Sequence, residues 1–191
     1  MNNKFLKRKK GFTFVEMMVS VGIITLLSVM ILGYNRQTET TTNLTRSANK
    51  LISELKRIQN QAMLILEENT TQGSKNICGW GMYFAEIPGS NLSIKEITPF
   101  VDYCDQLSGA GNQQYDKIKS EGKTPIPLVK KTEITETNIR SIVFVPPEPT
   151  IYFDPKTVDK AIIKLYLEDQ NSPYYIITIS KSGQISKELK N

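Results

Sequence analysis

The chain has 191 residues, with 24 Lys and Arg against 19 Asp and Glu, and it contains no histidine. The absence of histidine excludes a Ser-His or Cys-His nucleophile system, and two cysteines alone make a poor zinc cage, so we expect no enzyme, no cofactor and no metal site. Residues 1–11 hold five of the basic residues, which leaves 19 charges of each sign in the remainder and little reason to expect nucleic acid as a partner.

The first predicted element is an apolar run over residues 12–33 that carries a single charge, Glu16. Twenty-two helical residues span about 33 Å, enough for a hydrocarbon core of about 30 Å. The basic cluster at residues 7–10 is expected to keep the N-terminus in the cytoplasm and the C-terminal bulk outside. The run ends in Leu32-Gly33-Tyr34-Asn35, a poor match to a signal-peptidase site. We therefore expect a single-pass segment of the cytoplasmic (inner) membrane.

Glu16 is unusual because an acid within a bilayer costs on the order of 2.5 kcal/mol and normally has a partner. Cleavage at the Gly11-Phe12 junction would give Phe12 an α-amine four residues before Glu16, and this amine would be a natural counter-charge. The alternative is that Glu16 lies at the membrane edge and extends to water.

The segment GFTFVEMMVSVGIITLL resembles the class III signal of type IV prepilins and pseudopilins. The resemblance implies that a prepilin peptidase cuts between Gly11 and Phe12 and N-methylates Phe12. It also implies that Glu16 meets the Phe12 amine of an adjacent subunit, so that other pilins or pseudopilins are partners through this helix. Gly33 stands where many major pilins carry a helix-kinking proline.

Residues 34–68 are predicted to continue the helix as an amphipathic segment. Residues 43–68 contain no glycine or proline, and apolar residues recur every three or four positions. Residues 37–42 are polar and rich in threonine, a weaker helix former. We expect one helix over residues 12–68 with a weak point there, and a membrane anchor followed by a separate helix is the alternative.

The remaining residues, 69–191, are predicted to form an extracytoplasmic antiparallel β-sheet head, so that the fold class is α+β and pilin-like. A polar stretch over residues 107–131 is expected to be an exposed loop. The aromatic Trp80, Tyr83 and Phe84 are expected to pack in the core. The expected strands are residues 79–87, 138–145, 150–153, 161–168, 174–180 and, after a turn at Ser182-Gly183, 184–187.

The only cysteines, Cys78 and Cys104, both lie in the predicted head. An even number outside the cytoplasm favours one disulfide, and two thiols in a reducing setting are the alternative. Asp102, Asp105 and Asp116 match no calcium loop, and we expect them to be solvated acids.

The head resembles the GspH/FimT family of minor pilins and pseudopilins at residues 47–55, 79–84, 141–144 and 180–185. Together the two resemblances imply a structural subunit of a type IV pilus or type II secretion-like filament, located first in the membrane and then in a surface or periplasmic filament. The alternative is a DNA- or surface-binding tip pilin of a competence or adhesion filament. FimT-like proteins that bind DNA carry arginines around the late glycine, and residues 183–187 here have none.

Overall fold

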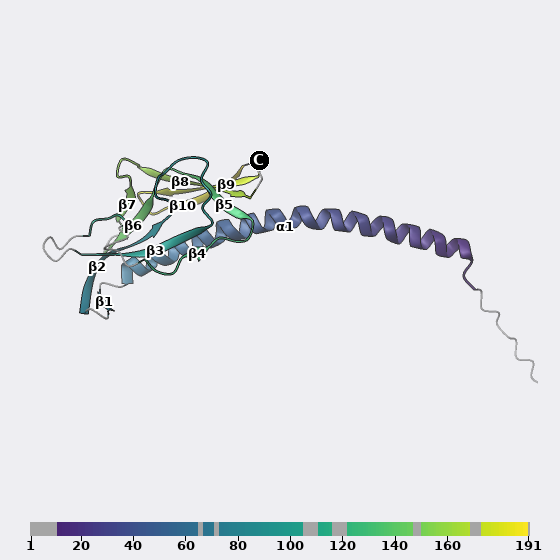
Figure 1. Ribbon diagram of the computed structural model, residues 1–191, viewed down its shortest axis with the longest axis horizontal. Coiled ribbons are helices and arrows are strands. Elements are labelled where there is room, and N and C mark those ends of the chain that lie inside the picture. The colour runs from purple at the N-terminus through teal and green to yellow at the C-terminus, as the bar shows by residue number, and fades with distance from the viewer. Residues whose placement is uncertain are drawn as a thin grey trace, which may run out of the picture. The chain divides into compact units, whose positions relative to one another are not determined.

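The computed structural model describes residues 11–64, 67–70, 73–104, 111–115, 122–146, 150–168 and 173–190, and only the backbone of residues 32–40, 67–70 and 73–75. The chain divides into two compact units, Met1–Glu39 and Thr40–Asn191. A single helix, α1 (Phe14–Leu64), begins in the first unit and ends in the second (Figure 1).

The described part of the first unit is dominated by the apolar start of α1. The window Phe14–Ile31 is long and apolar enough to cross a membrane, and none of it is buried within the described structure. Its leucine, isoleucine, valine, methionine and phenylalanine side chains are largely exposed. A helix with apolar side chains on every face requires an apolar environment, which a membrane or a set of neighbouring helices supplies.

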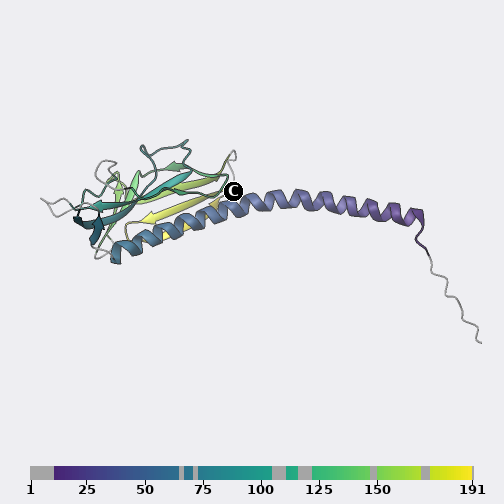
Figure 2. The same ribbon diagram turned by 60° about the horizontal axis from the view of Figure 1, so that its bottom comes forward.

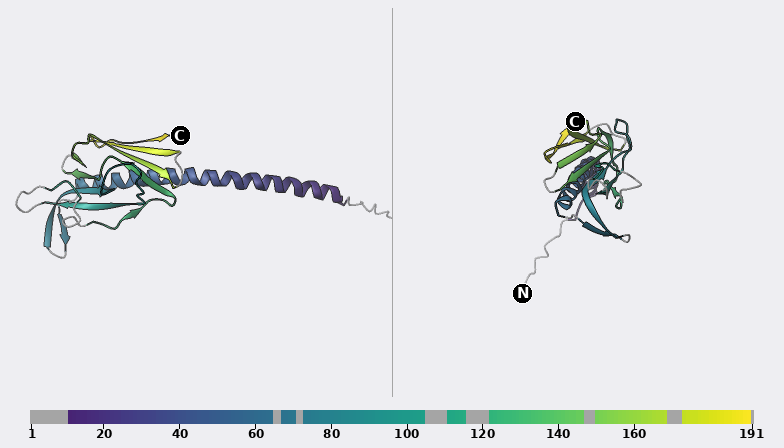
Figure 3. Two further views of the ribbon diagram at one scale, coloured as in Figure 1. Left: turned by 45° about the horizontal axis from the view of Figure 1, so that its top comes forward. Right: turned by 90° about the vertical axis from the view of Figure 1, so that its left-hand side faces the viewer.

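The second unit contains two antiparallel sheets built from the described strands (Figure 3). One sheet has the order β4 (Ile126–Pro127), β3 (Glu96–Tyr103), β2 (Gly73–Tyr83), β6 (Ser141–Val145), β7 (Thr150–Asp154), and β1 (Glu67–Thr70) also pairs with β2. The other has the order β10 (Ile185–Lys190), β9 (Tyr174–Ser180), β8 (Lys160–Leu167), β5 (Thr132–Thr137).

The core of this unit lies where the second half of α1 and both sheets meet. Burial alternates strictly along β8, as expected for a strand with one covered face. The helix contributes one stripe of side chains at spacings of three and four, each at most 1% exposed: Leu44, Ala48, Leu51, Leu55, Ile58 and Ala62. These side chains belong to the same buried cluster as strand residues from both sheets. Helix and sheets therefore share one hydrophobic core.

Polar contacts hold the second half of α1 on two sides. The Thr132 hydroxyl of β5 donates to Ser47 Oγ at 2.8 Å, and both side chains are buried. On the other side, Lys187 Nζ of β10 donates to Asn49 Oδ1 at 2.5 Å, where β10 runs beside the helix (Figure 2). The apolar stripe thus faces the core, while the two polar contacts go to the two edge strands of the four-stranded sheet.

The α+β class is confirmed, with two corrections to the predicted helix. The helix passes through residues 37–42 without a break, so the two-helix alternative is wrong. It starts at Phe14 rather than residue 12 and ends at Leu64 rather than residue 68. Glu67 and Glu68 instead pair with β2, because a ladder of backbone hydrogen bonds to that strand replaces a helical turn.

The antiparallel strands of the head form two sheets, and β1, β3, β4 and β5 were not anticipated. Strand β3 contains Pro99, which normally argues against an inner strand, and β5 carries one aliphatic residue, Ile134. Strand β6 starts at Ser141 rather than residue 138. Asn138 is instead bonded to β8, where its Oδ1 accepts from Ile162 N at 2.7 Å.

Further boundaries differ from the expectation. Strand β2 spans Gly73–Tyr83 rather than residues 79–87, and β10 spans Ile185–Lys190 rather than residues 184–187. The predicted turn is present, with Gly183 at φ +84°. The expected exposed loop is wrong over its last part, because β4 pairs with β3 and Leu128 is buried. Residues 107–110 and 116–121 of that loop lie outside the described residues.

Candidate processing and assembly site

The helix begins at Phe14 because Thr13 caps it. Glu16 N donates to Thr13 Oγ1 at 3.3 Å, and in return Thr13 N donates to Glu16 Oε2 at 3.1 Å. The Thr13 hydroxyl also donates to Glu16 Oε2 at 3.2 Å. This reciprocal arrangement is a capping box, in which an N-cap threonine and an acid three residues later satisfy backbone donors that the first helical turn leaves free.

Gly11 and Phe12 precede the cap and lie outside the helix. The Phe12 side chain is 79% exposed, and no atom lies within 4 Å of the position that a Cβ on Gly11 would occupy. The backbone on both sides of the Gly11-Phe12 peptide is therefore non-helical and accessible. The basic residues 7–10 lie outside the described residues.

The structure brings Glu16 to Thr13 rather than to Phe12. In the uncut chain the Phe12 nitrogen is an amide, so the counter-charge that the sequence suggested does not yet exist. One carboxylate oxygen, Oε2, is held by the cap, while Oε1 accepts no hydrogen bond from the described residues. Thr13 was not among the predicted site residues, although T-F-V-E is the threonine-x-x-glutamate pattern of a capping box.

The other polar side chains of the apolar segment are satisfied within the helix. Ser20 Oγ donates to Glu16 O at 2.7 Å, Thr25 Oγ1 to Val21 O at 2.5 Å, and Ser28 Oγ to Ile24 O at 2.8 Å. Hydroxyls bonded to the carbonyl four residues earlier leave no donor exposed to lipid. Glu16 is the only charged residue in the window 14–31.

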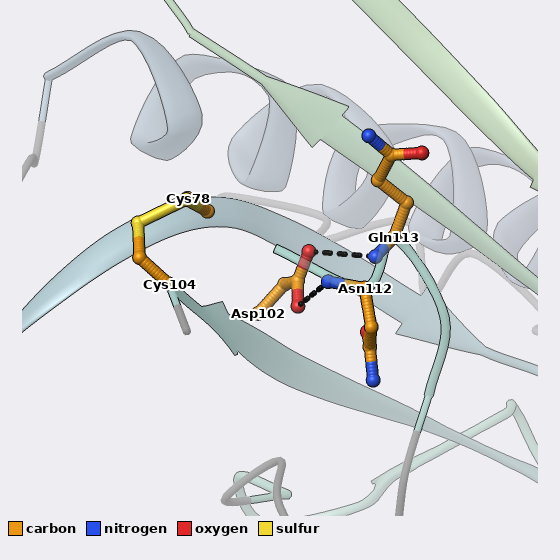
Figure 4. The surroundings of a disulfide bond; sticks show 5 residues. All are labelled: Cys78, Asp102, Cys104, Asn112 and Gln113. Carbon is orange, nitrogen blue, oxygen red and sulfur yellow. Dashed lines mark hydrogen bonds between the residues drawn. A yellow bond between two sulfur atoms is a disulfide. The ribbon is translucent and has the colours of Figure 1, made fainter. Parts of the chain in front are cut away.

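In the second unit, Cys78 and Cys104 form a disulfide with Cα atoms 5.0 Å apart (Figure 4). Cys78 is the extra residue of a β-bulge, since Ile77 pairs with Tyr103 and Gly79 pairs with Asp102. The bond therefore ties β2 to the end of β3 at the point where their regular pairing shifts. By the chain-entropy model, closing a loop of this size stabilises the fold by roughly 3–4 kcal/mol.

Asp102, beside this disulfide, is 3% exposed and anchors a returning segment. Its Oδ1 accepts from Asn112 N at 3.2 Å and its Oδ2 from Gln113 N at 3.0 Å (Figure 4). Gln113 has φ +60°, and successive backbone N–H groups around such a residue form a nest that suits an anion. Burial raises the pKa of Asp102, and the two N–H donors oppose that rise.

These contacts give Asp102 a structural role rather than that of a solvated acid. Asp105 and Asp116 lie outside the described residues. Within the described part of the chain, no group of three or more His, Cys, Asp or Glu side chains could hold a metal ion.

The aromatic residues of the β2 region pack as expected at two of three positions. Trp80 and Phe84 are buried in the core. Tyr83 is half-buried and stacks on Tyr115, with ring centroids 4.3 Å apart. Tyr115 also packs edge-to-face with Phe100. Both ends of the segment 111–115 are therefore attached to β2 and β3.

Comparison with known proteins identifies one feature. The family model described as the prokaryotic N-terminal methylation motif matches residues 6–32. No curated protein and no solved structure matches the chain. The matched segment contains the Gly11-Phe12 junction, the capping box and the apolar window of α1. The motif supports a class III signal of the type IV prepilin kind and indicates a pilin-like structural protein, and it implies processing by a prepilin peptidase and assembly with other pilins.

Proposed function

We propose that this chain is a minor pilin or pseudopilin, a structural subunit of a type IV pilus or type II secretion-like filament. The observation that carries the proposal is the methylation motif over residues 6–32, joined to a helix whose apolar window is unburied. An exposed apolar helix of this length suits storage in a membrane and later packing against the same helix of other subunits.

In this proposal residues 1–11 are a cytoplasmic leader that prepilin peptidase removes, and the enzyme then methylates the amine of Phe12. Residues 12–33 span the inner membrane and later enter the filament core, with Glu16 as the charge that meets a Phe12 amine during assembly. Residues 34–68 continue towards the head, and residues 69–191 form that head outside the cytoplasm. The accessible, non-helical Gly11-Phe12 peptide supports this assignment.

The minor-subunit assignment rests on the GspH/FimT-like segments of the head. The alternative, a tip pilin that captures DNA, would use positive charge near the C-terminus. Three lysines there are already engaged: Lys181 pairs with Asp159, Lys190 pairs with Glu188, and Lys187 donates to Asn49. Two of these three lysines are thus paired with an acid, which favours the structural role.

Intact and N-terminal mass spectrometry tests the proposal on the full chain extracted from membranes. The chain is coexpressed either with an active prepilin peptidase or with a catalytically inactive form as the control. We expect a chain that starts at Phe12 and carries one added methyl group with the active enzyme only. A chain that still starts at Met1 with the active enzyme, or that is cut after the apolar run, would refute the proposal.

A further inference from the structure

We propose that one end of the second unit docks on the anionic phospholipid headgroups of the membrane before the subunit enters a filament. Docking goes beyond the proposed function and rests on it in one respect, because the apolar window of α1 must lie in a bilayer. The docking surface, the basal surface, is the end of the four-stranded sheet that lies beside residues 45–50 of α1. Its side chains are Arg46, Lys50, Lys130, Lys131, Tyr174, Tyr175 and Leu189.

The basal surface forms because four strands begin or end at the same place beside the helix. Strands β5 and β9 start there and β8 and β10 stop there, since neighbouring strands of this sheet are antiparallel. Two contacts attach this end of the sheet to α1. The Thr132 hydroxyl donates to Ser47 Oγ at 2.8 Å, and the Tyr175 hydroxyl lies 3.3 Å from Thr45 Oγ1. The basal side chains therefore project from elements that are fixed to one another.

The basal surface carries an excess of positive charge. Arg46, Lys130 and Lys131 are exposed, and they form no ion pair with a described residue. Lys50 Nζ donates to the carbonyl oxygen of Pro127 at 2.6 Å, a contact that holds the ammonium in place without neutralising it. Four cations from two elements are thus gathered at this end of the sheet.

The described acids near the basal surface do not cancel this charge. Glu168 is paired with Lys95, and Glu188 is paired with Lys190, so these two pairs add no net charge. Glu96 lies opposite the end of β4 in the β3–β4 ladder and offsets one of the cations. The basal cations therefore outnumber the described acids beside them, and an anionic partner complements this surface.

The same surface also presents apolar and aromatic side chains. Leu189 is 49% exposed and lies opposite Tyr175 in the β9–β10 ladder. Tyr174 is half-buried and stacks on Tyr166, with ring centroids 4.5 Å apart. Tyrosine, lysine and arginine suit the headgroup level of a bilayer, because each joins an apolar body to a polar tip. The combination of cations, tyrosines and an exposed leucine fits a lipid surface.

The membrane is within reach because the basal surface begins on the same helix as the apolar window. The chain from Ile31, where the window ends, to Arg46 spans about 22 Å as a helix. Such a short tether holds the surface near the headgroups at an effective concentration of roughly millimolar order. Each lysine or arginine close to an anionic leaflet strengthens the attraction about fivefold, so a few cations suffice for docking.

Energy transfer from Trp80 to dansyl-labelled lipid tests docking on the full chain in vesicles. Trp80 is the only tryptophan and is buried in the core of the second unit, so energy transfer rises when this unit approaches the headgroups. One set of vesicles contains phosphatidylcholine, and the other contains equal parts of phosphatidylcholine and phosphatidylglycerol. We expect greater transfer in the anionic vesicles at low salt. This difference should disappear at high salt, because salt screens exposed charges.

Two double variants with the same change in charge separate the basal surface from the rest of the unit. Lys130→Gln with Lys131→Gln should lower the equilibrium constant for docking about 25-fold and make energy transfer equal in the two kinds of vesicle. Lys156→Gln with Lys160→Gln is the matched control, because both lysines are exposed and lie at the start of β8, away from the basal surface. The control should keep the native difference. In the native chain, Lys130 and Lys131 should also be acetylated more slowly, relative to Lys160, in the anionic vesicles.

The outcomes distinguish docking from the proposed function. A native chain that alkaline carbonate removes from both kinds of vesicle is not anchored by its apolar window, which refutes the membrane placement in the proposed function and docking with it. A retained chain with equal energy transfer in both kinds of vesicle, or with the same response in both double variants, refutes docking alone. Protection of Lys130 and Lys131 that grows with the number of chains per neutral vesicle would assign the basal surface to a neighbouring subunit and would also refute docking.

Discussion

At the scale of single residues, Asp102 couples the stability of the second unit to pH. Its folded-state pKa is raised by burial above the ordinary value of 3.8, so the ionised form opposes folding. The stability that the native carboxyl contributes is fully present below its unfolded pKa and is lost as pH rises through the raised folded pKa. The difference in free energy of unfolding between the native chain and Asp102→Asn, in favour of the native chain, should therefore shrink as pH rises from about 4.

This prediction can be measured by urea unfolding at several pH values, followed by the fluorescence of Trp80, the only tryptophan, which is buried in the core. Asp159 is a control with the opposite pH dependence, because its hydrogen bond and charge interaction with Lys181 lower its pKa. The advantage of the native chain over Asp159→Asn should instead shrink as pH falls. An advantage over Asp102→Asn that is independent of pH would contradict the burial argument.

Gly111 is required by close packing rather than by turn geometry. A Cβ at this position would lie 2.1 Å from Asp102 Oδ2 and 2.8 Å from Cys78 Cβ. Gly111→Ala should displace residues 111–115 from Asp102 and destabilise the unit by about 1–3 kcal/mol, the usual cost of overpacking. Gly89→Ala is the matched control, because nothing lies within 4 Å of its Cβ position. Equal urea midpoints for the two variants would argue against the contact.

At the scale of elements, the second half of α1 stabilises the head through its buried stripe. Leu51 is fully buried, and Leu51→Ala should cost about 2–5 kcal/mol because it removes a buried side chain and leaves a cavity. Lys56→Ala, on the exposed face of the same helix, should change stability by less than about 0.5 kcal/mol. Urea unfolding followed by Trp80 fluorescence measures the stability of both variants. Similar losses of unfolding free energy in the two would mean that the buried stripe does not stabilise the head.

The elements that could be predicted from the sequence are those whose apolar face, read from the residue pattern, is also the face that the fold buries. The stripe from Leu44 to Ala62 and the alternation along β8 each mark one face, and each of those faces is buried. Strand β5 has one aliphatic residue, Ile134, and is a strand because β8 pairs with it along one edge. Strand β3 tolerates Pro99, whose carbonyl accepts from Lys123 N at 2.8 Å. Such strands depend on partners that are distant in the sequence, and no local pattern reveals them.

At the scale of the whole molecule, membrane retention should depend on the unburied apolar window of α1. Ile23 lies near the middle of the window Phe14–Ile31. An arginine at the centre of a spanning helix costs about 2.5–3.5 kcal/mol on insertion scales, so Ile23→Arg should release much of the chain from membranes in alkaline carbonate. Ile23→Leu is the control and should be retained like the native chain. Full retention of the arginine variant would show that this window is not what anchors the protein.

The amino-acid sequence by itself determined the features that depend on neighbours along the chain. These are the basic leader, the Gly11-Phe12 junction, the apolar run and the amphipathic stripe that follows it, and together they already indicate a pilin-like subunit. Even the capping box was present in the sequence, because its two residues are only three positions apart.

Only the tertiary structure decided the features that depend on residues far apart. The two-sheet arrangement, the burial of Asp102 beside the disulfide, and the return of residues 111–115 to its carboxylate all join segments separated by other elements. The physical reason is that a helix hydrogen-bonds within itself and displays its pattern locally, whereas a strand or a buried carboxylate is satisfied only by whichever distant backbone the fold brings to it.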